Sequence, residues 1–160
     1  MDEATLNYLI ARFDIRSMLD VGCGPGGMVD AAHQRNIYAH GIDGDPFMRS
    51  AWVSIHDYTT GPLSMPITDF DLIWCTEFVE HIEQQYEDNY LATFDAGRVL
   101  FLTAAPPGFP GWHHVNCQPE QYWIALLEAR GWALDREATR WVRQNGGHVF
   151  SQRQGLVFTK

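Results

Sequence analysis

Residues 18–27 read MLDVGCGPGG, and this stretch decides the fold. A short apolar run containing Asp20 is followed by Gly22, Gly24, Gly26 and Gly27. Glycine permits a sharp turn and lets a ligand approach the backbone closely. The apolar run predicts a buried strand, and residues 26–36 have a helical pattern, so the free N–H groups of a helix start face the same turn. The stretch therefore predicts a strand, a ligand-binding turn and a helix.

The alternation of strand and helix continues along the chain. We expect helices at 3–13, 26–36, 77–97 and 119–131, and strands at 17–22, 38–43, 52–58, 70–76, 98–105, 132–142 and 155–160. This pattern predicts a mostly parallel sheet with helices on both faces. Gly61, Pro62 and Pro66 leave no room for a helix between the third and fourth strands. We predict one α/β, Rossmann-like domain over residues 1–160, with seven strands and an antiparallel C-terminal strand.

Composition limits the class of protein. The chain has 160 residues, of which 46% are hydrophobic and 13% aromatic, which argues against disorder. No apolar stretch has the length of a membrane span, and the acidic start MDEATL does not resemble a signal peptide. Three cysteines without a CxxC pair fit reduced thiols. We expect a soluble, cytoplasmic protein with no membrane partner.

The charge is uneven along the sequence. The formal net charge is -9, yet residues 130–160 contain five arginines and Lys160 against two acids. The strongly acidic remainder would repel nucleic-acid phosphates, so we do not expect a nucleic-acid partner. The basic C-terminal segment keeps a polyanionic partner open, although arginines on a solvated surface explain it as well.

Two templates fit the glycines. Gly22, Gly24 and Gly27 match the dinucleotide fingerprint GxGxxG, with an acid following at Asp43, and the same loop gives GxGxG through Gly26. Asp20 distinguishes the two kinds of site, because a carboxylate beside the phosphates of a dinucleotide would disfavour their binding. It suits an ammonium or sulfonium group instead. S-Adenosylmethionine carries both groups and no phosphate, so we expect this cofactor rather than NAD, with a ligand-free tight turn as the structural alternative.

The chain resembles the class I S-adenosylmethionine-dependent methyltransferases. LDVGCGPGG (19–27) resembles their first motif, GIDGD (41–45) the second and IHDY (55–58) the third. FDLIWCTEFVEHI (70–82) is similar to the fourth, in the form seen in small-molecule and sugar O-methyltransferases. HHVNCQPEQYWIALLEARGW (113–132) resembles the segment after the fifth strand in that group. The motifs occur in the family's order, so the resemblance implies the same activity.

The resemblance also implies a cofactor site. The glycine turn would line the methionine half, with Asp20 serving the amino group. Asp43 would accept from the ribose hydroxyls, unless it caps a helix. Asp57 would accept from the adenine amino group, unless it only forms a turn. The residues expected at the cofactor are Asp20, Gly22, Cys23, Gly24, Gly26, Asp43, Gly44, His56, Asp57, Tyr58 and Cys75, with His56 and Tyr58 flanking the adenine.

Acids and histidines after the fourth and fifth strands are the catalytic candidates. Glu77, Glu80 and His81 have the spacing of one helical face. Methyl transfer depends on alignment, and an oxygen acceptor also needs a base, for which histidine is the usual residue. We predict His113 or His114 as the base, with His81 as the other candidate and Glu77 near the site. These histidines could instead only cap the next helix and hold the loop.

A metal-dependent variant is a further alternative. Glu77, Glu80, His81 and His114 resemble the ligand pattern of metal-dependent methyltransferases that modify the 2′-oxygen at small-RNA 3′ ends. The same ExxEH pattern occurs in metal-free relatives, so we expect no metal.

We therefore predict O-methylation of a sugar, a glycan or another small molecule. A non-catalytic module that binds S-adenosylmethionine and the metal-dependent RNA enzyme are the alternatives. Full-size relatives have a helix between the third and fourth strands and additional lid segments, which this chain lacks. Without these segments the site would be open, and it could accept a large acceptor or be completed by a second chain. The apolar surface that the missing helix leaves exposed predicts a homodimer.

Overall fold

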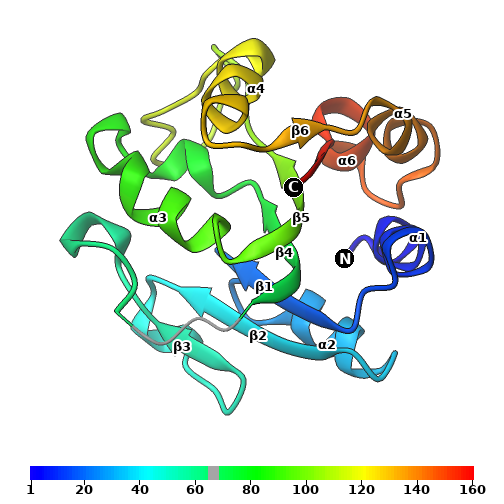
Figure 1. Ribbon diagram of the computed structural model, residues 1–160. Helices are drawn as coiled ribbons and strands as arrows, with labels where there is room; N and C mark the ends of the chain where they lie inside the picture. The colour runs from blue at the N-terminus through cyan, green and yellow to red at the C-terminus, as the bar shows by residue number, and fades with distance from the viewer. Residues whose placement is uncertain (65–68) are drawn as a thin grey trace.

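The computed structural model describes residues 1–64 and 69–160, and seven strands in this part form one sheet (Figure 1). The strand order is β3-β2-β1-β4-β5-β7-β6. Strands β1 to β5 pair in parallel, whereas β7 runs antiparallel to both β5 and β6, as the sequence predicted. The strands are β1 Ser17–Val21, β2 Tyr38–Asp43, β3 Val53–Ile55, β4 Phe70–Thr76, β5 Gly97–Thr103, β6 Ala133–Leu134 and β7 Leu156–Thr159.

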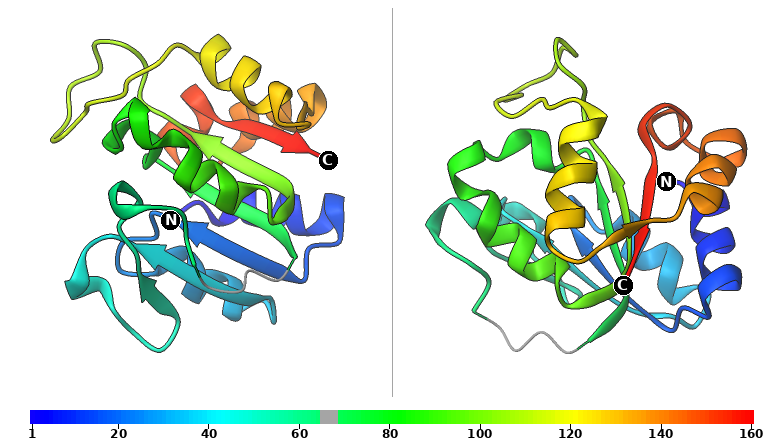
Figure 2. Two further views of the ribbon diagram at one scale, coloured as in Figure 1. Left: turned by 60° about the vertical axis from the view of Figure 1, so that its left-hand side comes forward. Right: turned by 45° about the horizontal axis from the view of Figure 1, so that its top comes forward.

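Helices cover both faces of the sheet. In the right-hand view of Figure 2, α3 (Glu87–Phe94) and α4 (Glu120–Ala129) lie on one side. The other side carries α1, α2, α5 and α6, where α5 packs on both α1 and α6, and α1 also contacts α2. These helices are α1 Glu3–Phe13, α2 Gly27–His33, α5 Arg136–Asn145 and α6 Val149–Gln154, and the 3-10 turns are η1 Pro46–Met48, η2 Tyr58–Thr60, η3 Val79–His81 and η4 Gln84–Tyr86.

The two-sided core explains why the strands read as continuous apolar runs. In β4, Leu72 and Trp74 pack against the α1 and α2 side, whereas Ile73 and Cys75 pack against the α3 and α4 side. Successive side chains of a strand point to opposite faces, so a strand buried on both faces needs apolar residues at every position.

Two predicted elements are wrong. The helix expected at 77–97 is divided into η3, η4 and the shorter α3, and Gly97 begins β5 instead of ending a helix. The strand expected at 132–142 is limited to Ala133–Leu134, because the side chain of Asp135 accepts a hydrogen bond from Ala138 N at 2.8 Å and starts α5. Neither α5 nor α6 was expected.

The described part of the link between β3 and β4 contains little helix, as predicted. It contains the single 3-10 turn η2 and no α-helix, while residues 65–68, including Pro66, lie outside the described residues. No helix in the described part of the chain has both the length and the apolar character to span a membrane.

The strand order reverses between β1 and β4. Chain segments after β1 and β4 therefore leave the sheet in different directions and open a crevice at the carboxyl edge, the edge where β1 to β5 end. The predicted site residues lie in the last residues of β1, β2 and β4 or in the segments that follow β1 to β5.

Candidate functional site

The glycine turn after β1 has the backbone that its sequence predicted. Gly22, Gly24 and Gly26 all have left-handed φ angles of 76°, 52° and 87°. The N–H groups of Gly22 and Cys23 donate to Ile42 O at 2.8 and 3.1 Å, which fixes the turn against β2. Helix α2 begins directly afterwards and has no side-chain cap. Its first N–H groups are therefore available to a ligand at the carboxyl edge.

Phe78 is a neighbour of this turn that the sequence did not reveal. A Cβ atom at Gly22 would lie 2.5 Å from the ring of Phe78, so glycine is required there for packing as well as for its φ angle. The ring also lies 5.9 Å from that of Tyr58 and 5.8 Å from that of Tyr90. The turn thus contacts an aromatic cluster on the α3 side of the sheet.

Asp20 lies beneath the turn and is 2% exposed. Burial, and after it the nearby Asp43, raises the pKa of Asp20 to about 8. Burial, Asp20 and Asp43 together raise the pKa of the Cys23 thiol to about 12. In the described part of the chain no cation pairs with Asp20, so the arrangement suits a ligand that brings a positive group.

Asp43 ends β2 and holds the turn. Its Oδ2 accepts from Gly24 N at 2.7 Å and its Oδ1 accepts from Asp45 N at 2.9 Å. Asp45, not Asp43, caps the following η1 turn. Each carboxylate oxygen can accept a second hydrogen bond. Asp43 therefore retains the capacity to bind ribose hydroxyls, and the adjacent Gly44 is exposed.

Asp57 and His56, which were expected near the adenine, both contact their own loop. Asp57 lies two residues beyond β3 and caps η2, where its Oδ1 accepts from the N and Oγ1 of Thr59 at 2.8 and 2.7 Å. This is the turn-forming role considered as its alternative, although the side chain remains exposed. His56 Nε2 lies 3.0 Å from Gly61 O, which leaves its ring half-buried beside Asp57.

Two predicted cofactor contacts are corrected by burial. The ring of Tyr58 is 2% exposed and its hydroxyl donates to Thr93 Oγ1, so this side chain packs in the core and its polar group is satisfied there. Cys75 is 0% exposed and faces the α3 and α4 side. Burial raises the pKa of its thiol well above the usual range. It is a core residue and offers no surface to the cofactor.

Glu77 directly follows β4 and has an unusual backbone conformation. Its φ of 51° is left-handed, so no helix starts here and Glu77, Glu80 and His81 do not share a helical face. Thr103 at the end of β5 fixes Glu77, because its Oγ1 donates to Glu77 Oε1 at 2.9 Å and Glu77 N donates back to that Oγ1 at 3.1 Å. Burial, followed by Glu80, raises the pKa of Glu77 to about 7.

Tertiary contacts nevertheless gather Glu80, His81 and His114. One potential ligand atom of each lies within 4.8 Å of the others. Glu80 is 0% exposed; its Oε1 accepts from Ala105 N at 3.2 Å, while its Oε2 has no partner. His114 Nδ1 lies 3.1 Å from Phe109 O, a geometry in which Nδ1–H donates and Nε2 is free to bind.

His113 is not one of the three residues of this group. It is exposed, has a φ of 51°, and its ring lies 5.4 Å from that of Trp112. Asn116 anchors the loop, because its N donates to Glu80 O at 3.0 Å and its Nδ2 donates to Glu87 Oε1 at 2.8 Å. The expected loop-holding contacts are therefore present, alongside the His114 cluster.

A cavity of about 340 Å³ opens beside Glu77 on the α1 and α6 side. Neither His81, His113 nor His114 lines it. Sequence reasoning missed two lining residues, His148 at the N-cap of α6 and Phe150 within α6. The pair Gly146–Gly147 before them was a local signal of a chain break. The lining residues are Met1, Asp2, Cys23, Pro25, Gly27, Met28, Trp74, Thr76, Glu77, Thr103, His148, Phe150 and Ser151.

Comparisons with known proteins agree with this architecture. Residues 19–100, just over half of the chain, match the model of a family described as a methyltransferase domain. The sugar N-methyltransferase KedS8 from Streptoalloteichus sp ATCC 53650 has a TM-score of 0.70 at 16% identity, with 98% of this chain and 85% of that chain covered. No curated protein matches the chain.

Two further solved structures share the fold. Magnesium protoporphyrin IX methyltransferase from Synechocystis PCC 6803, with bound S-adenosylmethionine, has a TM-score of 0.69 at 16% identity and covers 97% of this chain and 76% of that chain. The methyltransferase domain of bacterial CtHen1 has a TM-score of 0.64 at 14% identity, with 98% of this chain and 96% of that chain covered.

Proposed function

Because the chain belongs to the methyltransferase domain family, we propose that it methylates an oxygen atom of a sugar, a glycan or another small molecule. The protein is a methyltransferase, and its cofactor is S-adenosylmethionine. The acceptor and its reacting atom are the proposed part.

The position of Glu77 carries this proposal. Its carboxyl group lines the cavity at the carboxyl edge, and its pKa of about 7 suits proton transfer near neutral pH. In methyl transfer to a hydroxyl, the acceptor oxygen bonds to the methyl carbon, the carbon–sulfur bond breaks, and the hydroxyl proton goes to a base. Glu77 takes that role here ahead of His113, His114 and His81, since these three do not line the cavity.

Asp20 and Asp43 support the placement of the cofactor. Asp20 is a buried acid without a cation, and it would bind the ammonium group of the methionine half. Asp43 would accept from the ribose hydroxyls through the free lone pairs of both carboxylate oxygens. Cys23 and Gly27 of the glycine turn line the same cavity as Glu77, so a cofactor held by this turn would meet the acceptor there.

Charge and relatives support a small acceptor. The net charge of -9 disfavours a nucleic-acid partner. The similar structures include a sugar N-methyltransferase and a porphyrin methyltransferase, both of which act on small molecules. We infer that this enzyme does so too.

The test is a transfer assay with isotope-labelled S-adenosylmethionine and paired acceptors, neutral sugars against the corresponding amino sugars, with the methylated atom identified by NMR. We expect O-methyl products. Glu77→Gln should lower the transfer rate about 10²- to 10³-fold, within the usual range for loss of a general base, without changing cofactor affinity. Methylation confined to nitrogen, or an unimpaired Glu77→Gln enzyme, would contradict the proposal.

A metal-assisted reaction is the second candidate, favoured by the orphan Oε2 of Glu80. With His81 and the free Nε2 of His114, it forms a donor set that suits a divalent ion, and the Nδ1 contact of His114 to a backbone carbonyl is typical of metal-binding histidines. A bound ion would polarise an acceptor oxygen.

Calorimetry with Mg²⁺ and Mn²⁺ separates the two candidates. In the metal-assisted case, both the heat of binding and the dependence of transfer on the ion should disappear in Glu80→Gln. Full transfer in the presence of EDTA would exclude this candidate and leave Glu77 as the base.

We also propose the homodimer. Phe47 and Trp112 are 92% and 87% exposed, an unusual state for large apolar side chains. A light-scattering mass equal to one chain of 18.2 kDa would refute it.

A further inference from the structure

We propose that the acceptor binds in the cavity beside α6, that His148 and Phe150 hold it there, and that it is a neutral hydroxyl compound with one apolar, ring-sized face. This inference rests on the methyl-transfer function proposed above. It adds two residues that the sequence motifs do not indicate, and it narrows the class of small-molecule acceptor.

The cavity has the size and the two-sided chemistry of a small-molecule site. Its volume is about 340 Å³, and Cys23 and Gly27 of the glycine turn line part of it, so the space suits one small acceptor beside the cofactor. Hydroxyl and carboxyl groups come from the ends of β4 and β5, at Thr76, Glu77 and Thr103. Apolar atoms come from Met28 at the start of α2 and Phe150 on α6. A ligand that fills the cavity must therefore present hydroxyl groups along one edge and an apolar face elsewhere.

The charge of the lining selects against anions. Asp2 and Glu77 line the cavity, whereas no lysine or arginine does so in the described part of the chain. A phosphate or carboxylate on the acceptor would face these two acids, with no lysine or arginine of the described residues beside it. The lining therefore disfavours an anionic acceptor.

His148 offers a hydrogen-bond donor. It precedes α6, and its Nδ1 accepts from Phe150 N at 3.4 Å as the helix cap. A neutral imidazole whose Nδ1 accepts carries its hydrogen on Nε2. His148 therefore donates to an acceptor oxygen instead of removing a proton, while Glu77 accepts from the reacting hydroxyl. The ring of Phe150, 5.0 Å from that of His148, supplies the apolar platform.

Contacts with the start of α1 hold His148 in place. Gly147 N donates to Asp2 Oδ1 at 2.7 Å, and the same oxygen accepts from Thr5 N at 3.0 Å. Gln152 Nε2 closes the turn by donating to Gly146 O at 2.7 Å. Asp2 is 4% exposed, so this anchor is part of the core. The acceptor site is thus built before any ligand arrives, which lowers the entropic cost of binding.

The experiment measures probe binding by ligand-observed NMR to the protein loaded with S-adenosylhomocysteine. The probes are p-cresol, methyl α-L-rhamnopyranoside and glucose 6-phosphate. We expect binding of at least one neutral probe and none of the phosphate. Binding of p-cresol alone indicates a phenolic acceptor, and binding of the rhamnoside alone indicates a deoxysugar.

The variant His148→Asn keeps a side-chain acceptor for the α6 cap and removes the imidazole donor. It should weaken the neutral probe about 5- to 10-fold, the effect of one hydrogen bond, and leave the affinity for S-adenosylhomocysteine within about twofold. The matched control is His40→Asn, at a histidine on β2 that bonds Ser54 Oγ and does not line the cavity.

Three results would overturn the inference: no binding of either neutral probe, binding of glucose 6-phosphate as tight as theirs, or equal effects of His148→Asn and His40→Asn. If the wild-type protein failed to bind S-adenosylhomocysteine at all, the proposed function itself would fail. Binding of the cofactor product without the probes refutes the acceptor site alone.

Discussion

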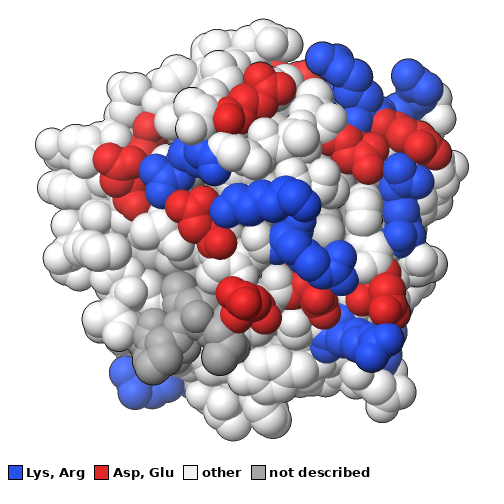
Figure 3. Space-filling view, in the orientation of Figure 1, with Lys and Arg blue, Asp and Glu red and all other residues white. Residues whose placement is uncertain are grey.

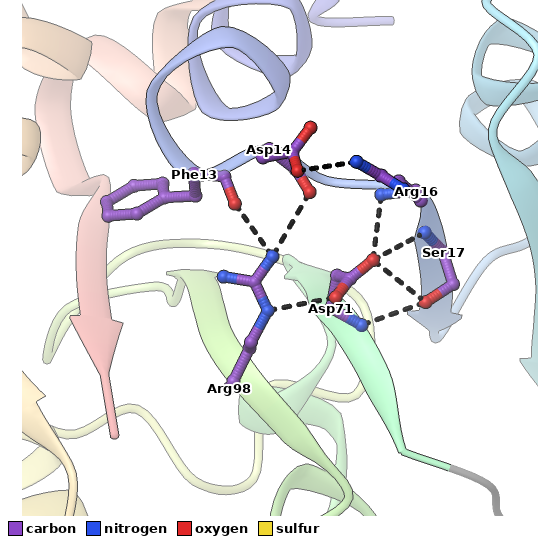
Figure 4. A network of polar contacts seen from close by, with 6 residues as sticks. All are labelled: Phe13, Asp14, Arg16, Ser17, Asp71 and Arg98. Atoms are coloured by element: carbon purple, nitrogen blue, oxygen red, sulfur yellow. Dashed lines mark hydrogen bonds and ion pairs between the residues drawn. The ribbon is translucent and has the colours of Figure 1, made fainter.

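At the amino edge of the sheet, where β1, β4 and β5 begin, the carboxylate of Asp71 is surrounded by donors. At the carboxyl edge, Asp20 and Glu80 are buried and form no ion pair with a lysine or arginine among the described residues. Asp71 Oδ2 accepts from Arg16 N at 2.8 Å and its Oδ1 accepts from Arg98 Nε at 2.9 Å (Figure 4). Burial alone would raise the pKa of Asp71, but these partners hold it below its usual value. The carboxyl-edge acids have raised pKa values instead.

The difference separates structure from function. Arg98 continues from Asp71 to the carbonyl oxygens of Phe13 and Asp14, so the amino-edge network ties the end of α1 to β4 and β5 (Figure 4). Such a network is satisfied internally and needs no ligand. Acids left without a cation cost stability, and they cluster where a ligand can supply the missing charge.

On the protein surface, as at the amino edge, acidic side chains pair with basic ones. Lys and Arg side chains lie among Asp and Glu side chains over the face drawn in Figure 3. Arg130 and Lys160 both pair with Asp95, at 2.7 and 3.0 Å, and Arg143 pairs with Glu120 at 2.7 Å. Much of the basic C-terminal segment is therefore neutralised locally, which weakens the case for a polyanionic partner.

The largest effect should come from the pH dependence of Asp20. Its folded pKa of about 8 exceeds the unfolded value of about 3.9, so the folded state binds an extra proton between these values. Its stabilising contribution is complete below about pH 4 and is lost as pH rises towards 8. The slope approaches about 1.4 kcal/mol per pH unit.

Urea unfolding of the cofactor-free protein at pH 5 and pH 7 measures this term. Because of Asp20, the unfolding free energy of the wild type should fall by up to about 2.7 kcal/mol from pH 5 to pH 7. This contribution to the fall should be absent in Asp20→Asn. Asp30→Asn, at an exposed acid of α2, is the control. Parallel curves for wild type and Asp20→Asn would show that Asp20 is ionised in the folded state.

Much of the fold follows from local sequence because the parallel strands are buried on both faces. Leu72 to Cys75 form a continuous apolar run for that reason, and the glycine turn needs left-handed φ angles that few other residues adopt. The cap at Asp135 was also a local signal, but the apolar residues on both sides of it suggested a strand. Propensity arguments fail where two signals compete over so few residues.

The rest of the site depends on contacts between distant residues. Glu77 departs from helix because Thr103, 26 residues away, fixes it. His148 reaches the cavity because Gly147 bonds to Asp2, 145 residues away. Sequence motifs predicted which acids lie at the carboxyl edge, but they could not predict which side chains close the cavity.

A smaller effect, on cofactor affinity, is expected from replacing Asp43, the residue of the carboxyl edge that would bind the ribose. Asp43→Ala should raise the dissociation constant of S-adenosylmethionine about 50-fold, since hydrogen bonds to a charged group contribute about 1.5–3 kcal/mol. Asp43→Asn retains one oxygen for Gly24 N and should weaken binding less. Calorimetry measures both. Equal affinity in Asp43→Ala and wild type would remove Asp43 from the cofactor site.

The smallest effect is expected from replacing Asp71 at the amino edge, and it should leave cofactor affinity unchanged. Asp71→Ala removes the acceptor of Arg98, Arg16 N and Ser17 N, and we expect a loss of about 2 kcal/mol in unfolding free energy with unchanged cofactor affinity. The folded pKa of Asp71 is depressed, so its stabilising contribution is present above the unfolded pKa of about 3.9 and is lost as pH falls through the folded value. The stability difference between wild type and Asp71→Ala should therefore shrink below about pH 4, the opposite sign to Asp20. If Asp71→Ala weakened the cofactor as much as Asp43→Ala, the two edges would be coupled and their separation into structural and functional acids would be wrong.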